Sequence, residues 1–141
     1  PLTGAAVGEP LVGHSEAVRA VAFATATAGM PLLASASEDR TVRLWDQRNG
    51  EPAVRTLTGH TDWVGSLAFT ATPDGRPLLA SAGGDKTIRI WDPGTGSPVM
   101  TLRRRSVIRR LAAGGPLLAI GDDEGLSVIE LDATHDEGPC C

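Results

Sequence analysis

The sequence contains few cysteines and no long apolar run. Its only two cysteines are the last two residues, Cys140 and Cys141, so no disulfide framework holds the domain together. The longest apolar runs, such as 31–36, are far shorter than the roughly 20 residues that a membrane-spanning helix needs. The first residues, 1–4, carry neither the basic nor the apolar region of a signal peptide. We therefore expect a cytoplasmic protein that does not enter a membrane.

Lysine is almost absent, and acidic residues outnumber basic ones. Lys86 is the only lysine among 13 basic residues, and 17 acidic residues give a formal net charge of −4. A nucleic-acid partner is therefore not expected. Five arginines do gather between 103 and 110, but no aromatic side chain interleaves them as a stacking platform. We expect these arginines to pair with the acidic tail or with residues 122–124 instead.

The most informative feature of the sequence is an internal repeat. Three markers recur 46 residues further on: Gly13-His14 as Gly59-His60, Asp39 as Asp85, and Trp45-Asp46 as Trp91-Asp92. The two units align without a gap from 11 to 52 in the first copy. A period in the forties, with Gly-His early and Trp-Asp late, is typical of arrays whose repeats stack on one another to share a core.

Short apolar segments predict the strands of each unit. They are rich in β-branched residues and are separated by glycine- and proline-containing turns. The inner segments are apolar throughout rather than alternating, as a sheet that is buried on both faces requires. The predicted strands are 18–23, 32–36, 41–45 and 54–57, then 64–69, 78–82, 87–91 and 99–102, then 107–112, 116–121 and 126–131.

In the order and spacing of these markers, the chain resembles the WD40-repeat family of β-propellers. The resemblance implies an all-β fold, a partial propeller of about three four-stranded antiparallel blades over residues 1–131. We expect an outer strand of a preceding blade at 5–12, repeats at 13–57 and 59–102, and a degenerate terminal repeat at 103–131, followed by a disordered tail at 132–141. By alignment, the terminal repeat has Arg104-Arg105, Ile120, Glu124 and Glu130 in place of Gly59-His60, Ser81, Asp85 and Trp91. The arginine-rich composition suggests a bacterial-type array, and the degenerate last repeat suggests that the chain is the C-terminal part of it.

Two sets of polar residues allow two interpretations. A serine, a histidine and an aspartate within hydrogen-bond reach could act in acyl transfer, as a nucleophile, a base and an acid. The family resemblance instead implies a buried structural network that also includes a tryptophan. We favour the structural role, because the set occurs twice with a Trp each time and no G-x-S-x-G turn is present. The sets are His14, Ser35, Asp39 and Trp45, and His60, Ser81, Asp85 and Trp91.

The resemblance also implies which residues reach the top face of the propeller, near its channel. They are Ala17, Arg19, Glu38, Trp63, Gly65, Gly84, Val107, Arg109 and Asp123. Trp63 is of special interest because its counterpart in the first unit is Ala17, so the fold does not require an aromatic side chain there. Trp and Arg are enriched among residues that dominate binding. Trp63 is therefore either a binding anchor or a side chain packed on the neighbouring blade.

Propellers usually have four to eight blades, so about three blades would leave apolar sheet faces uncovered. We expect missing upstream blades to cover them, or a second copy joined head to tail in a six-bladed ring. The predicted function is a non-catalytic protein–protein interaction scaffold, with no cofactor and no metal. His135 and Asp136 near the terminal cysteines match no zinc spacing. The alternatives are a regulatory C-terminal sensor module of a longer bacterial signalling protein, attached to a kinase or nucleotide-binding switch, and a hydrolase that uses the His/Ser/Asp sets.

Overall fold

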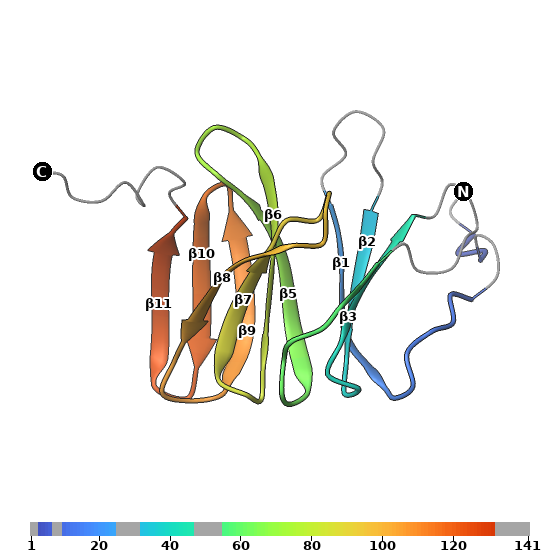
Figure 1. Cartoon of the computed structure of the whole chain (residues 1–141), viewed down its shortest axis with the longest axis horizontal. Coiled ribbons are helices and arrows are strands. Elements are labelled where there is room, and N and C mark those ends of the chain that lie inside the picture. The colour runs from blue at the N-terminus through green and yellow to red at the C-terminus, as the bar shows by residue number, and fades with distance from the viewer. Residues whose placement is uncertain (1–2, 7–9, 25–31, 47–54, 132–141) are drawn as a thin grey trace, which may run out of the picture.

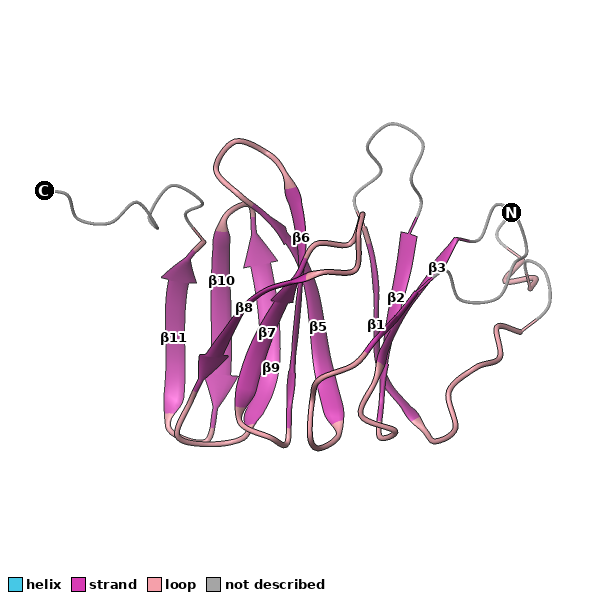
Figure 2. Cartoon of the chain, viewed as in Figure 1, coloured by secondary structure: helices cyan, strands magenta, loops and turns pink. Residues whose placement is uncertain are grey.

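The computed structural model describes residues 3–6, 10–24, 32–46 and 55–131, and all its regular elements are strands (Figure 2). The first sheet contains β1 (Val18–Phe23), β2 (Leu32–Ser37), β3 (Val42–Asp46) and β4 (Arg55–Leu57). The second contains β5 (Val64–Ala71), β6 (Pro77–Gly83), β7 (Thr87–Trp91) and β8 (Pro98–Arg103). The third contains β9 (Ile108–Gly114), β10 (Leu117–Asp122) and β11 (Gly125–Glu130). In the part of the chain that is described, no helix is long and apolar enough to cross a membrane.

Each sheet is an antiparallel meander in which strands that follow one another in sequence are paired. The three sheets stand side by side in chain order (Figure 1). This is the arrangement of propeller blades, with β1, β5 and β9 as the first strands of successive blades. The chain therefore has an all-β fold made of partial propeller blades. Each strand predicted between residues 18 and 131 overlaps an observed strand, with bounds that differ by at most two residues.

Apolar side chains fill the two interfaces between the three sheets. One core joins the first sheet to the second and contains Leu44, Leu67 and Trp91. The other joins the second sheet to the third and contains Ile88 and Leu118. The middle sheet contributes to both cores, and six of the seven residues of β6 are buried. A strand that is buried on both faces explains why this segment is apolar throughout instead of alternating.

The two outer sheets expose side chains at positions that are buried in the middle sheet. Val21 on β1 is 64% exposed, whereas Leu67, its counterpart on β5, is 8% exposed. Leu117 on β10 is 46% exposed, whereas Leu78, its counterpart on β6, is 3% exposed. We call the two exposed surfaces the end faces: Val18, Val21 and Phe23 belong to the first, and Leu117, Leu126 and Val128 to the second. Each end face lacks the neighbouring sheet that covers the same position in the middle sheet.

Strand register corrects one part of the sequence alignment. On β6, Leu79 is paired with Trp91, and the corresponding residue on β10, Leu118, is paired with Ile129. The counterpart of Trp91 in the third sheet is therefore Ile129 and not Glu130. The reason is that the turn between β10 and β11 is one residue shorter than the turn between β6 and β7. Ile129 packs on the core, whereas Glu130 is exposed.

The predicted outer strand at 5–12 is absent from the positions that are described. Residues 5, 6 and 10–12 are exposed and form no strand, and residues 7–9 lie outside the described residues. A strand needs a paired neighbour to satisfy its backbone groups, and none of the described strands lies beside this segment. The predicted tail at 132–141, which includes His135 and both cysteines, also lies outside the described residues.

Candidate functional site

In the second blade, four side chains form one continuous chain of hydrogen bonds. Trp91 on β7 donates its indole N–H to Ser81 Oγ on β6 over 2.8 Å. Ser81 Oγ lies 2.7 Å from His60 Nε2, and His60 Nδ1 lies 2.9 Å from Asp85 Oδ2. His60 precedes β5 and Asp85 lies in the turn after β6. The chain of bonds therefore ties the loop before the blade to that turn and to two of its strands.

The burial and the hydrogen-bond partners of this network favour one arrangement of its protons. Burial lowers the pKa of His60, although Asp85 acts in the opposite direction. A neutral His60 with its proton on Nδ1 donates to Asp85, and its Nε2 accepts the hydroxyl proton of Ser81. Ser81 Oγ then accepts the indole N–H of Trp91. Every polar side-chain atom that faces the interior of this set thus has a hydrogen-bond partner. The hydrogen bonds therefore offset the free-energy cost of removing these atoms from water.

Asp85 is held as a carboxylate by several donors. Burial alone would raise its pKa, but the Thr87 hydroxyl, His60 and the backbone N–H of Thr61 together keep the pKa below its usual value. The Thr87 hydroxyl donates to Oδ1 over 2.7 Å, and the Thr61 N–H donates to Oδ2 over 3.1 Å. Sequence reasoning missed Thr87. The spacing Asp85-Lys86-Thr87, which repeats Asp39-Arg40-Thr41 with the same Asp-to-Thr interval, was the available signal.

The first blade contains the same network at the predicted positions. His14 lies 2.9 Å from Asp39 Oδ2 and 2.7 Å from Ser35 Oγ, and Trp45 donates to Ser35 Oγ over 2.9 Å. Burial would raise the pKa of Asp39, but hydrogen bonds from Thr41, His14 and the backbone of residue 15 hold it well below the usual range. The third blade has no such set. Ile120, in the place of Ser81, is fully buried in the apolar core instead.

The order of groups in these networks is also that of a nucleophile, a base and an acid. A hydrolase would need an open approach to the serine oxygen, because a substrate carbonyl must come within reach of it. Ser81 is 0% exposed and Ser35 is 5% exposed, and each accepts a hydrogen bond from a buried Trp. The geometry therefore suits a structural role, because the buried hydroxyls leave no space for a substrate and are already held by hydrogen bonds on both sides.

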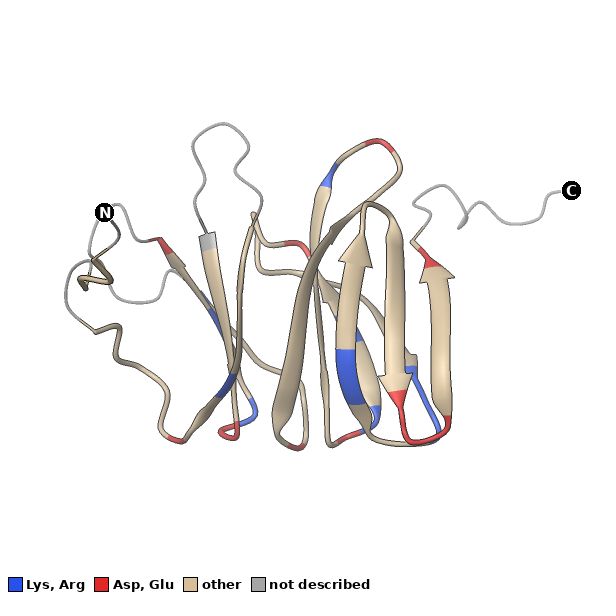
Figure 3. Cartoon of the chain, turned by 180° about the vertical axis from the view of Figure 1, so that it is seen from behind, with Lys and Arg blue, Asp and Glu red and all other residues tan. Residues whose placement is uncertain are grey.

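The residues predicted for the top face come together at one edge of the sheets. Arg19, Gly65 and Arg109 each occupy a β-bulge, where the pairing of the first strand with the second shifts by one residue. Bulges redirect a side chain out of the regular pleat. Figure 3 shows acidic residues in the turns at this edge, with basic residues on the strands just beside them.

Each bulge residue faces a residue of the turn between the second and third strands. In the first blade Arg19 contacts Glu38, with an N–O distance of 2.5 Å. In the third blade Arg109 contacts Asp123 at 3.2 Å. The corresponding pair in the second blade is Gly65 and Gly84, which has no side chains. The sequence predicted that arginines of 103–110 pair with acidic residues of 122–124. Among the described residues, Arg109–Asp123 is the only ion pair of this kind.

Trp63 occupies the space that the two glycines leave. A Cβ atom added to Gly65 would lie 2.6 Å from the Trp63 ring, and one added to Gly84 would lie 2.5 Å from it. The ring therefore lies directly on the backbone of its own blade. Trp63 is half-buried, while Ala17, its counterpart, is exposed and Val107 is partly buried. Any side chain at Gly65 or Gly84 would displace the indole.

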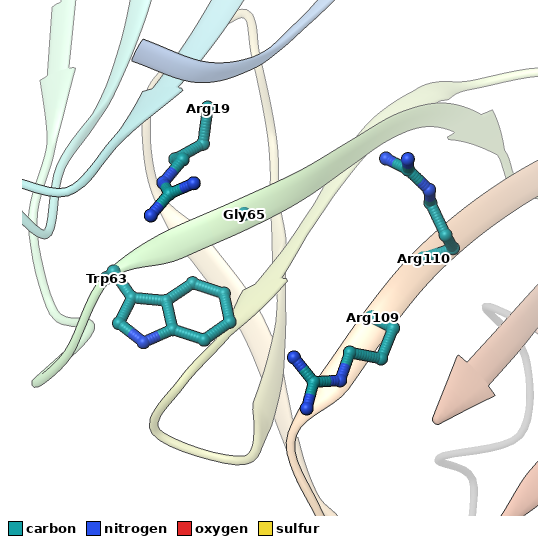
Figure 4. A pocket seen from close by; sticks show the side chains of 5 residues that line it. All are labelled: Arg19, Trp63, Gly65, Arg109 and Arg110. Atoms are coloured by element: carbon teal, nitrogen blue, oxygen red, sulfur yellow. The ribbon is translucent and has the colours of Figure 1, made fainter. Parts of the chain in front are cut away.

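A hollow of about 460 Å³ opens beside Trp63. Its lining residues come from β1, the start of β5, and β9 (Figure 4), and they are Arg19, Trp63, Gly65, Arg109 and Arg110. Sequence reasoning did not select Arg110. Its position directly after the bulge residue Arg109 was the only signal, and its importance depends on a bulge that a sequence does not reveal.

Comparison with known proteins assigns the chain to a family. The model for the WD domain, G-beta repeat, matches residues 7–46 and 52–92, which together make up more than half of the chain. The chain belongs to the WD-repeat family. Protein transport protein SEC13 of Chaetomium globosum is 48% identical over 44 residues, which are 31% of this chain. The matched segment covers 15% of the length of that relative.

Removal of the Asp85 carboxylate should destabilise the WD-repeat fold. In Asp85→Ala the buried His60 N–H and the Thr87 hydroxyl lose their acceptor, and we expect a loss of about 2–4 kcal/mol in the free energy of unfolding. Urea denaturation followed by Trp fluorescence measures this loss. Glu124→Ala, at the aligned but exposed position of the third blade, is the control and should change stability by less than about 0.5 kcal/mol. Equal losses in the two variants would contradict a structural role for the network.

The networks should also make the fold sensitive to acid in two separate pH ranges. The pKa of His60 is lowered on folding, so between its folded pKa and about 6.5 the unfolded chain binds a proton that the folded chain does not, and stability falls as pH falls. Asp39 and Asp85 also have lowered pKa values, so their contribution is complete above about 3.8 and is lost as pH falls further. Melting temperatures between pH 7 and pH 3 test this.

The matched variant for the upper range is His60→Gln, which cannot titrate. It should melt at a lower temperature at pH 7 and should show a weaker dependence on pH between 7 and 5 than the unaltered chain. The decline below pH 4 should remain, because Asp39 still titrates. A pH dependence between 7 and 5 that is unchanged in His60→Gln would show that another group causes it.

Proposed function

We propose that the chain is a non-catalytic scaffold that binds a protein partner at the hollow beside Trp63. The observation that carries the proposal is the lining of the hollow: a Trp ring laid on two glycines, with arginines around it. Trp and Arg are the residue types that most often dominate binding energy at protein interfaces. The buried serines support the non-catalytic part of the proposal, since neither network offers an accessible nucleophile.

Membership of the WD-repeat family supports the same proposal. The matched relative is named as a protein transport protein, a name that states no chemical reaction. The matched segment covers only 15% of that relative, so protein transport itself is not carried over. For the context of the chain, we propose the C-terminal part of a bacterial-type array in the cytoplasm. The third blade supports this placement because it has lost the network, and terminal repeats are commonly atypical.

Trp63 can be tested without disturbing the fold, because the first blade has Ala17 at the same position. We expect the free energy of unfolding of Trp63→Ala to lie within about 1 kcal/mol of that of the unaltered chain. The immobilised chain is used to capture partners from a lysate of its own organism, and mass spectrometry identifies them. Each partner, purified, should bind to this variant at least roughly tenfold more weakly than to the unaltered chain. Val99→Ala, an exposed apolar change on β8, is the control and should bind normally. A partner that binds both variants equally would place the binding surface elsewhere.

We further propose that the two end faces bind other propeller blades. The support is the comparison within the chain: counterparts of the exposed Val21 and Leu117 are buried wherever a neighbouring sheet is present. The covering blades could belong to the same polypeptide or to a second copy, joined so that the first end face of one copy meets the second end face of the other. The shared requirement is an apolar sheet face of matching shape.

Sedimentation velocity distinguishes the two sources of covering blades. A second copy predicts a particle of about twice 14.6 kDa at micromolar concentration, and Leu126→Asp on the second end face should return it to the mass of one chain. Val99→Ala serves again as a control that should leave the assembly intact. A particle of 14.6 kDa at every concentration would exclude the second copy and leave blades of a longer polypeptide as the source.

A further inference from the structure

The hollow beside Trp63 offers hydrogen-bond donors and no side-chain acceptor. Three of its five lining residues are arginines, whose guanidinium groups only donate, and the fourth side chain is an indole, whose N–H also only donates. The fifth lining residue is Gly65. The other two tryptophans, Trp45 and Trp91, donate their indole N–H groups to serines. The structure gives the indole N–H of Trp63 no acceptor among the described residues.

The arginines differ in how far their charge is already neutralised. Arg19 and Arg109 each have one carboxylate partner, Glu38 and Asp123, and neither partner lines the hollow. Their side chains are 54% and 59% exposed, so each guanidinium keeps donors available to a ligand. Arg110 is exposed and has no ion pair with any residue that the structure describes. The wall of the hollow is therefore cationic, although the chain as a whole carries a net charge of −4.

We infer that the hollow binds an oxyanion on a partner polypeptide, either a carboxylate or a phosphate group. An oxyanion supplies several acceptor oxygens to Arg110, which has no ion pair with a described residue, and to the donors that Arg19 and Arg109 leave unused. Guanidinium groups match its planar or forked geometry. The half-buried indole beside these donors adds an apolar surface for a neighbouring side chain of the same segment. This inference rests on the proposed function and adds to it the charge of the segment that is recognised.

Small aromatic anions test the inference on the full chain. The probes are benzoate and phenyl phosphate, each with a ring and an oxyanion, and benzamide, the neutral counterpart of benzoate. The readout is the indole N–H resonance of Trp63 in two-dimensional NMR of the uniformly labelled protein, assigned with Trp63→Phe. Trp45 and Trp91 are internal controls because their indoles are buried and bonded. We expect one or both anions to shift the Trp63 resonance to saturation, and benzamide to leave it unchanged.

Two variants, each of which removes one positive charge, show whether the anion binds in the hollow. Arg110→Gln should weaken binding of the better anion roughly fivefold, because a guanidinium without a competing partner is lost. Arg103→Gln, an exposed arginine of β8 outside the hollow, should weaken it less than twofold. Tighter binding of phenyl phosphate than of benzoate would indicate a phosphorylated segment, and the reverse order would indicate acidic side chains.

Three results would overturn the inference: no saturable shift with either anion, an equal shift with benzamide, or equal effects of the two arginine variants. These results leave the proposed function open to its own test, because Trp63→Ala can still abolish partner binding when the hollow takes a neutral segment. Failure of the Trp63→Ala test together with saturable anion binding would instead show an anion site that is not the surface used by the partner.

Discussion

Each inner strand of this chain presents apolar side chains on both faces of its sheet, and a sheet of that kind cannot bury itself. The middle sheet solves the problem with a neighbour on either side, which leaves its core residues such as Leu79 and Ile90 fully buried. Burial at about 25 cal/mol per Å² of apolar surface makes this stacking the main source of stability. The same requirement explains the end faces, where the pattern of apolar residues continues but the neighbouring sheet does not.

Stacking of flat apolar faces does not by itself hold the loops and turns in place. The His60 and His14 networks supply this restraint, because each joins residues about 25 positions apart through a buried carboxylate. A buried polar network is stabilising only when every donor and acceptor in it has a hydrogen-bond partner. One shared proton between each pair of contacting atoms meets that condition. The third blade follows a different solution, with Ile120 packed in the core and a shorter turn in which Asp122 Oδ1 accepts the backbone N–H groups of Glu124 and Gly125.

The sequence was sufficient to predict the strands between residues 18 and 131 and the His, Ser, Asp and Trp residues of both networks, because repetition marks them and because apolar runs mark a sheet buried on two faces. It was not sufficient where geometry depends on a one-residue change in a turn. Glu130 was aligned with Trp91 for that reason, whereas register assigns Ile129 to this place. Arg110 was missed because a β-bulge sets the direction of the residues around it. Bulges arise from strand pairing and leave no pattern along the chain.

The face beside Trp63 shows how repeats of one fold acquire different surfaces. In the first and third blades, an arginine at the bulge pairs with an acidic turn residue, so each position is partly neutralised. In the second blade both positions are glycine, and the space is filled from two residues upstream by an indole. The fold accepts either arrangement, since none of these side chains belongs to a core. Selection can therefore act on this edge of the sheets for binding alone, while the networks and cores keep the platform rigid.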